Sequence, residues 1–237
     1  YGPPGVGKST LASRAAGAVF LDLDRETDYL DVPRFKVRTF AELNEAITSL
    51  RNYGVRKGYK HVVVDNATAL ERILGSEVLR RNPKWPNLEA PGFNRGFNQL
   101  IDEWSRFLLK MNEIMDAGMS VVIVAHSRIK TTTDPLVDHY DRFEPDVRKE
   151  MVSQLPAGMD NVLFMRRGIS RGSEDTNNRV YDGAPELFTR DTPQCVAKTR
   201  AGLPGNLLVS TFDWNMLFNN ARKDPSNDKS VGDGSDL

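Results

Sequence analysis

The chain has little of several features that would assign it to a class of protein at once. It contains 1 cysteine and 3 histidines among 237 residues, so it can form no internal disulfide and offers no cysteine–histidine metal cluster. Its 32 basic and 32 acidic residues cancel, which excludes a globally basic surface for nucleic acid. No apolar run reaches membrane-spanning length and no secretion signal is visible. These absences predict a cytoplasmic protein with no membrane partner.

The composition that remains suits one globular domain. With 39% hydrophobic and 27% charged residues, the chain can bury a sizeable core. From residue 219 onward it consists mostly of Asn, Asp, Ser, Lys and Gly, with almost nothing apolar. The sequence therefore predicts a folded domain over 1–218 and a disordered polar tail over 219–237.

A phosphate-binding motif opens the chain and matches the pattern G-x-x-x-x-G-K-[ST]. The residues concerned are Gly2, Pro3, Pro4, Gly5, Val6, Gly7, Lys8, Ser9 and Thr10. Glycines let backbone N–H groups converge on phosphates, Lys8 adds a positive charge near the outer phosphates, and Ser9 offers its hydroxyl to Mg²⁺. The motif predicts a site for ATP, or another nucleoside triphosphate, with Mg²⁺.

Only Tyr1 precedes this motif, whereas such a loop normally follows a buried strand. We expect the first strand of the sheet to be missing from the chain. Neighbouring strands would then lose ladder partners, and we expect the isolated chain to be poorly soluble or weakly stable.

Helical and extended patterns alternate through the first two-thirds of the chain. Strands are predicted at 19–24, 61–65 and 121–125, and helices at 11–18, 39–50, from 68 onward, at 97–115 and from 145. Capping boxes, Thr39 with Glu42 and Thr68 with Glu71, open two of these helices. Long loops are predicted at 80–96 and 127–141, and short strands at 162–165, 186–189, 195–198 and 207–211. The order predicts an α/β fold, a doubly wound, mostly parallel sheet with β-rich C-terminal additions.

Acidic residues follow two of the predicted strands. Asp65 ends the valine-rich strand, where a carboxylate can hold Mg²⁺ for phosphoryl transfer; the alternative is that it caps the next helix. Because Asn66 follows it instead of a second acid, the base that orients water must come from elsewhere. Asp24 is the first candidate and Glu26 the second, and the alternative for both is a solvated loop acid.

Two further polar sites lie later in the chain. His126 ends the strand 121–125, where it could sense the outer phosphate, or else be a structural histidine. Lys198 and Arg200 are two residues apart at a strand end, so both project to one side. Such a pair could reach the phosphates of a neighbouring subunit, and the alternative is an exposed basic strand end.

Taken together, the phosphate loop, Asp65 with no acid after it, His126 and the run Lys198-Thr199-Arg200 resemble the RecA-type ATPase core. More narrowly, they are similar to phage AAA-domain ATPases related to RecA, some of which act in single-strand annealing or recombination. The resemblance covers residues 2–212. It implies an Mg²⁺-dependent ATPase in which Asp24, at a position where the family more often has Glu, activates water. It also implies that Lys198 and Arg200 act across a subunit interface of a homo-oligomer.

The same resemblance implies contact with single-stranded DNA through the loops after the two later core strands. The residues there are Arg80, Arg81, Lys84, Trp85 and Arg95, then Arg128 and Lys130. Cations along a backbone with an aromatic ring for stacking are what single-strand binding requires, and the first loop offers both.

Two other functions stay open. An AAA+-like remodelling or loading ATPase is favoured by Pro3-Pro4 in the phosphate loop, but Asn66 breaks the pair of acids that this class usually carries. A small-molecule kinase would require an arginine-rich lid and activity as a monomer.

Overall fold

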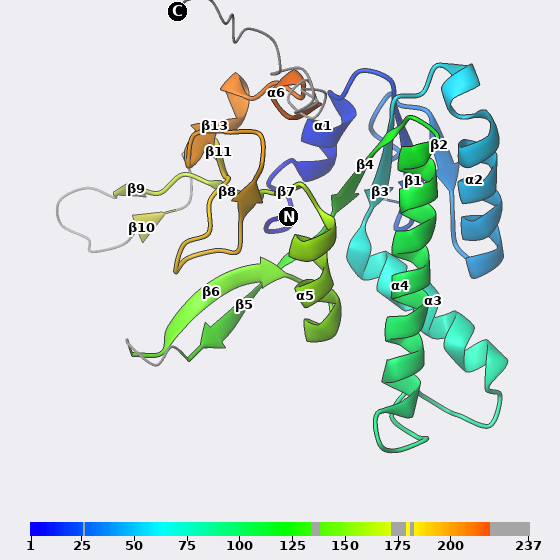
Figure 1. Ribbon diagram of the computed structural model, residues 1–237. Coiled ribbons are helices and arrows are strands. Elements are labelled where there is room, and N and C mark those ends of the chain that lie inside the picture. The colour runs from blue at the N-terminus through cyan, green and yellow to red at the C-terminus, as the bar shows by residue number, and fades with distance from the viewer. Residues whose placement is uncertain (26, 134–137, 172–178, 181–182, 219–237) are drawn as a thin grey trace, which may run out of the picture.

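A parallel sheet with helices on both faces forms one part of the molecule, and a strand-rich part lies beside it (Figure 1). The structure is a computed structural model that describes residues 1–25, 27–133, 138–171, 179–180 and 183–218. The helices are α1 (Lys8–Ser13), α2 (Phe40–Tyr53), α3 (Ala67–Arg81), α4 (Arg95–Asp116), α5 (Lys149–Gly158) and α6 (Asn215–Phe218), with 3-10 turns at Val55–Lys57 and Val209–Thr211. The strands are β1 (Ala18–Asp22), β2 (Arg34–Lys36), β3 (His61–Asp65), β4 (Ser120–Val124), β5 (Ser127–Thr132), β6 (Tyr140–Pro145), β7 (Asn161–Val162), β8 (Phe164–Arg167), β9 (Ser170–Arg171), β10 (Arg179–Val180), β11 (Pro185–Phe188), β12 (Lys198–Thr199) and β13 (Asn206–Leu208).

The central sheet has four parallel strands in the order β2-β1-β3-β4. Their register aligns Asp22, Asp65 and Val124 in one row at the ends of β1, β3 and β4. The valine-rich β3 has a strand on each side and is buried throughout. The predicted parallel α/β sheet is confirmed, and the segments that follow its strands meet at one edge, called here the carboxyl edge.

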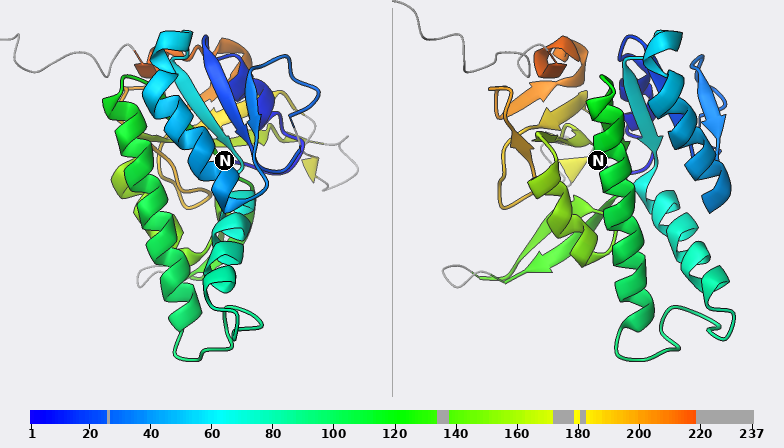
Figure 2. Two further views of the ribbon diagram at one scale, coloured as in Figure 1. Left: turned by 90° about the vertical axis from the view of Figure 1, so that its right-hand side faces the viewer. Right: turned by 45° about the vertical axis from the view of Figure 1, so that its right-hand side comes forward.

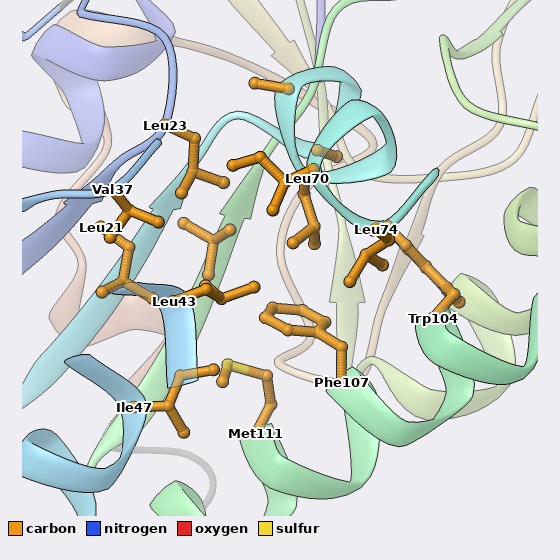
Figure 3. Close-up of a cluster of buried hydrophobic side chains, with 14 of the residues drawn as sticks. Leu21, Leu23, Val37, Leu43, Ile47, Leu70, Leu74, Trp104, Phe107 and Met111 are labelled. Carbon is orange, nitrogen blue, oxygen red and sulfur yellow. The ribbon is translucent and has the colours of Figure 1, made fainter. Parts of the chain in front are cut away.

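Helices cover both faces of this sheet because side chains alternate along its strands. Leu21 points to one face, where α2, α3 and α4 contribute buried side chains such as Leu43, Leu74 and Trp104 (Figure 3). The views of Figure 2 show these three helices on the same side of the sheet. On the opposite face, Phe20 packs in a cluster with Ala12 of α1 and with Ala15, which follows that helix.

Tyr1 and Gly2 lie between β4 and β8. Gly2 N donates to Ala125 O at 3.2 Å, just beyond the end of β4. On the other side, Tyr1 N donates to Leu163 O at 2.8 Å, and Met165 N donates to Tyr1 O at 2.8 Å, which is parallel pairing. The loop that follows Gly2 therefore starts at the carboxyl edge, next to β4.

The strand-rich part comprises an antiparallel sheet in the order β13-β11-β8 and the pair β12-β7. Three of the four short strands predicted here lie close to β7–β8, β11 and β13. The strand predicted at 195–198 differs, because β12 covers only Lys198–Thr199. Cys195 lies outside it and forms isolated bridges with Phe143 and Thr192.

The prediction of a polar loop over 127–141 is wrong, because β5 and β6 form an antiparallel hairpin there. The hairpin projects from the sheet, and cross-strand pairs of polar side chains stabilise it (Figure 1). Its sequence is therefore polar and lacks the apolar pattern by which strands are predicted. Arg128 Nε and Nη2 donate to Glu144 Oε1 at 2.9 and 2.6 Å across the two strands.

Helix α3 begins and ends at residues other than those predicted. Its N-cap is Asn66, whose Oδ1 accepts from Ala69 N at 2.9 Å, so the proposed capping box of Thr68 with Glu71 is wrong. The helix runs to Arg81, and the connection to α4 is therefore shorter than the predicted loop over 80–96. The capping box of Thr39 with Glu42 at the start of α2 is confirmed. The tail predicted at 219–237 lies outside the described residues.

An aromatic stack fixes α6 against α1 and the start of β3. The rings of His61 and Phe218 stack with centroids 4.1 Å apart, and Trp214 stacks on Phe218 at 5.6 Å. Trp214 Nε1 also donates to Leu11 O at 2.9 Å. Burial, and secondarily the Lys60 ammonium, lowers the pKa of His61 below its usual 6.5.

We expect the free energy of unfolding to fall as the pH drops below about 6.5, because the unfolded chain takes up a proton that buried His61 resists. The variant His61→Gln loses this part of the pH dependence, whereas His139→Gln, at an exposed histidine, keeps it. Urea unfolding at about pH 5.5 and pH 7.5 measures the difference. Equal pH dependence in the two variants would contradict the assignment.

Candidate functional site

The phosphate loop has a backbone shape that only glycine adopts without strain at two positions. Gly5 and Gly7 have φ angles of 71° and 99°. A Cβ on Gly2 would lie 2.1 Å from the carbonyl oxygen of Met165, so this position also requires glycine. Helix α1 begins at Lys8, directly after the loop.

Lys8 folds over the loop that it closes. Its Nζ donates to the carbonyl oxygens of Gly2 and Pro3, at 2.9 and 2.8 Å. Val6 is 6% exposed and anchors the middle of the loop in a hydrophobic cluster, whereas Pro4 and Thr10 are exposed. Lys8 and Val6 thus hold the loop against the protein, and the opposite side of the loop is open to solvent.

The residues at this edge fit a magnesium-bound triphosphate. No atom lies within 4 Å of the position that a Cβ on Gly5 would occupy, so the backbone there is accessible to a phosphate. The Ser9 hydroxyl and the Asp65 carboxylate are hard oxygen ligands of the kind that Mg²⁺ prefers. Among the described residues, no group of three or more His, Cys, Asp or Glu side chains could hold a metal. The phosphates would therefore supply ligands as well.

Asp65 ends β3 and is 3% exposed. It shares the row at the carboxyl edge with Val124 of β4, and Gly2 pairs just beyond the end of β4. The alternative that Asp65 caps the next helix is wrong, because Asn66 provides that cap. The carboxylate therefore lies buried at the edge that also carries the phosphate loop.

His126 follows β4, between Asp65 and the phosphate loop. Its Nε2 lies 3.4 Å from Asn66 Nδ2, and its Nδ1 is buried with no hydrogen-bond partner among the described residues. Its backbone bridges Gly2 on one side, and its carbonyl oxygen accepts from Asp146 N at 2.8 Å on the other. His126 thus contacts the loop, the end of β3 and the base of the β5–β6 hairpin.

The acids after β1 have different environments. Asp22 is fully buried and its carboxylate accepts from Arg25 N and Thr27 Oγ1, at 2.7 and 2.9 Å, so it shapes the turn after the strand. Asp24 is half-buried and its Oδ1 accepts from Arg72 Nη2 of α3 at 2.7 Å. Glu26, the second candidate base, lies outside the described residues.

Lys198 lies in β12 and Arg200 just after it, and each has a contact within the chain. Lys198 Nζ donates to Met159 O at 3.1 Å, and Arg200 Nη1 donates to Asp160 Oδ1 at 2.8 Å. The side chains of Arg200 and Asp160 are 63% and 65% exposed. Because Tyr1 pairs with β8 in parallel, residues before Leu163 lie away from the carboxyl edge. Arg200 therefore lies away from the phosphate loop of its own chain.

Most of the cations named for DNA contact are bound to carboxylates. Arg80 and Arg81 both bind Glu77, which is 6% exposed, and Arg81 also binds Glu103 of α4. Together they tie the end of α3 to α4.

The other residues named for DNA contact have individual environments. Arg128 and Lys130 flank Glu144 in the hairpin. Arg95 donates to Pro91 O within its own loop, and Trp85 is half-buried against the main core. Lys84 is exposed.

Two residues that sequence reasoning missed stand out. Phe93, at the turn before α4, is 95% exposed, and its φ of 49° is left-handed. The neighbouring Pro91-Gly92 turn is a local signal that could have drawn attention to it. Arg72 had no local signal, because its partner Asp24 lies 48 residues earlier in the chain.

Fold and loop together define a P-loop nucleotide-binding site on a parallel α/β sheet. Residues 1–201 match the family model of the AAA domain. The chain therefore belongs to the AAA-domain family of P-loop ATPases. No curated protein matches the chain in sequence. Within the described residues, no helix has the length and apolar character needed to cross a membrane.

Asn66 has two roles that substitution can separate. We expect Asn66→Ala to lower the free energy of unfolding by about 0.5–2 kcal/mol, because α3 loses its cap. Asn66→Ser keeps a capping oxygen but loses the amide that faces His126, so we expect it to recover most of this stability. Urea unfolding of both variants measures the difference, and equal losses would contradict the capping role.

Proposed function

We propose that the protein is an Mg²⁺-dependent ATPase of the RecA-like type that acts as a homo-oligomer on single-stranded DNA. The observation that carries the ATPase proposal is the meeting of phosphate loop and buried Asp65 at one edge, with β4 between them. Resemblance to phage ATPases favours recombination or replication as the setting, with the ATPase domain at 1–218.

In this proposal the loop binds the phosphates, Lys8 neutralises the outer ones, and Ser9 and Asp65 hold the metal ion. Mg²⁺ supplies charge neutralisation on the transferred phosphoryl group. His126, beside Asn66 and one strand from Asp65, is suited to sense the outer phosphate. Its carbonyl contact with Asp146 connects that position to the hairpin.

Asp24 is proposed as the group that orients the attacking water. The end of β1 is three strand spacings from Gly2, or about 14 Å, because β3 and β4 lie between them. Asp24 can act only if the triphosphate extends from the loop over the ends of β4 and β3. That path passes Asp65, which agrees with a metal ion held between loop and base.

The homo-oligomer proposal depends on Arg200. Its guanidinium is exposed and lies away from the phosphate loop of its own chain. A charge that stabilises the transferred phosphoryl group from this position has to act on a neighbouring subunit, with Lys198 beside it.

DNA contact is proposed at two elements that project beyond the sheet (Figure 1). One is the α3–α4 pair, whose connecting turn carries the exposed Lys84 and Phe93. The other is the β5–β6 hairpin with Arg128 and Lys130. A cation together with an exposed ring provides charge for the backbone and a surface for base stacking.

We expect Lys8→Ala to abolish ATP turnover, with a loss on the order of 100-fold or more, because the charge on the outer phosphates is lost. Calorimetric titration with Mg²⁺ and ATP, together with phosphate release, measures binding and turnover. Lys57→Ala, at an exposed lysine in the turn after α2, is the matched control. Normal turnover in the Lys8 variant would refute the proposed function.

We expect Arg200→Ala to leave ATP binding intact and to lower turnover by about 1,000-fold or more. A mixture of the two variants tests whether Arg200 acts on its own subunit or on a neighbouring one. Arg200→Ala subunits have an intact phosphate loop, and Lys8→Ala subunits have an intact Arg200. If Arg200 acts across an interface, a mixture of the two inactive variants recovers turnover. Arg190→Ala is the control in the same strand-rich part. Absence of recovery in a mixed oligomer contradicts action between subunits.

A further inference from the structure

A cavity of about 750 Å³ lies at the carboxyl end of β1, between the start of α2 and the exposed face of α3. Its charged lining consists of Arg25, Arg38, Arg72 and Arg80 with Asp24 and Glu77. Four positive and two negative charges leave an excess of two positive charges, in a chain whose formal net charge is zero. We call this cavity the α2–α3 groove.

Both carboxylates of the groove, Asp24 and Glu77, already form ion pairs with arginines. Glu77 binds Arg81 outside the groove as well as Arg80. The side chain of Arg25 makes no hydrogen bond or ion pair to another described residue, and its backbone has a left-handed φ of 61°. Arg38 has a partner outside the groove, because its Nη1 lies 3.8 Å from Oδ1 of the buried Asp22. The positive charge left over for an anionic ligand is therefore mainly that of Arg25.

Three polar residues of the lining form a row along α3. Arg72, Ser76 and Arg80 are spaced at i, i+4 and i+8, so they repeat about every 6 Å along one helix face. The side chains of Arg72 and Arg80 are 64% and 72% exposed. Phosphates of an extended single strand follow one another at a comparable spacing. A row of donors suits a phosphodiester backbone better than one compact phosphate group.

The first arginine of this row holds the proposed base. Arg72 Nη2 binds Asp24 Oδ1 at 2.7 Å, and the two side chains are 64% and 33% exposed. An exposed ion pair of this kind contributes little to stability, so a competing anion can replace one partner. While the pair exists, a carboxylate oxygen of Asp24 is directed to α3 instead of to water at the outer phosphate.

We infer that the α2–α3 groove binds the backbone of single-stranded nucleic acid, and that Arg72 exchanges Asp24 for a phosphate and so releases the base. Arg72 is then a positioning residue that couples occupancy of the groove to turnover. The inference rests on the proposed function through Asp24, and it adds a second anion site and its ligand class. It makes no use of Phe93 or the β5–β6 hairpin.

Binding is tested first, because it does not depend on hydrolysis. Fluorescence anisotropy of a labelled oligo(dT) is measured over a range of salt concentrations for the full chain and for the double variant Arg72→Gln with Arg80→Gln. Loss of two phosphate contacts reduces the slope of log K against log salt by about 1.4. Arg51→Gln is the matched control, since Arg51 and Glu113 form an exposed ion pair at 2.7 Å away from the groove. An unchanged slope in the double variant overturns the inference.

Turnover is tested second. We expect Arg72→Gln to raise ATP turnover without DNA several-fold, towards the rate of the DNA-bound wild type, and to lose most of the stimulation by oligo(dT). Arg51→Gln keeps both rates. A low basal rate with normal stimulation in Arg72→Gln, in a variant with an unchanged melting temperature, overturns the inference.

A comparison of anions distinguishes a site for a nucleic-acid backbone from a site for one phosphate group. Stimulation of wild-type turnover by dTMP or inorganic phosphate as effective as that by oligo(dT) means that the groove takes a single phosphate group, and overturns the backbone assignment. If the wild type hydrolyses no ATP, the proposed function fails, while the anisotropy slopes still decide whether the groove binds the strand.

Discussion

The candidate site depends on the backbone pairing that holds Gly2 between β4 and β8. Gly2 N donates to Ala125 O, and Ser127 N donates to Gly2 O, at 3.2 and 3.0 Å. Because a Cβ there would overlap the carbonyl oxygen of Met165, only glycine lets the strands approach this closely. The pairing determines where the phosphate loop leaves the sheet, and the register of β3 with β4 determines where Asp65 ends. Ladder hydrogen bonds therefore bring loop and carboxylate together before any ligand binds.

The position of β4 between these two groups connects the site to the rest of the molecule. His126 leaves the end of β4, and its carbonyl oxygen accepts from Asp146 N. Asp146 O in turn accepts from Thr68 Oγ1 of α3, at 2.9 Å. One backbone segment after the hairpin thus contacts both β4 and α3, the two elements that frame Asp65. A displacement of His126 would be passed to the hairpin and to α3 through the same short contacts.

Local patterns predicted the parts of this structure that local chemistry controls. The phosphate loop, the buried β3 and the capping box of Thr39 with Glu42 each involve residues within nine positions, and all three occur as predicted. The predicted N-cap of α3 was wrong because Asn66 and Thr68 are both good capping residues. The helix begins directly after β3 ends at Asp65, which makes Asn66 the N-cap. The Asp24–Arg72 pair and the binding of Arg81 to Glu103 join elements far apart in sequence, and no local pattern encodes them.

In the proposed function, such pairing also accounts for selective binding of a polyanion by a chain without net charge. Glu77, Glu103 and Glu144 each bind two cations and so reduce the positive charge that would otherwise attract any nucleic acid. The side chains of these carboxylates are only 5–11% exposed, so the loss of a cation would leave a buried charge unpaired, and these pairs keep their partners. The pair of Asp24 with Arg72 differs, because both side chains reach solvent and a phosphate held nearby can replace one of them. In the α2–α3 groove the displaced partner is Asp24, so the same exchange that strengthens binding also changes the chemistry of the nucleotide site.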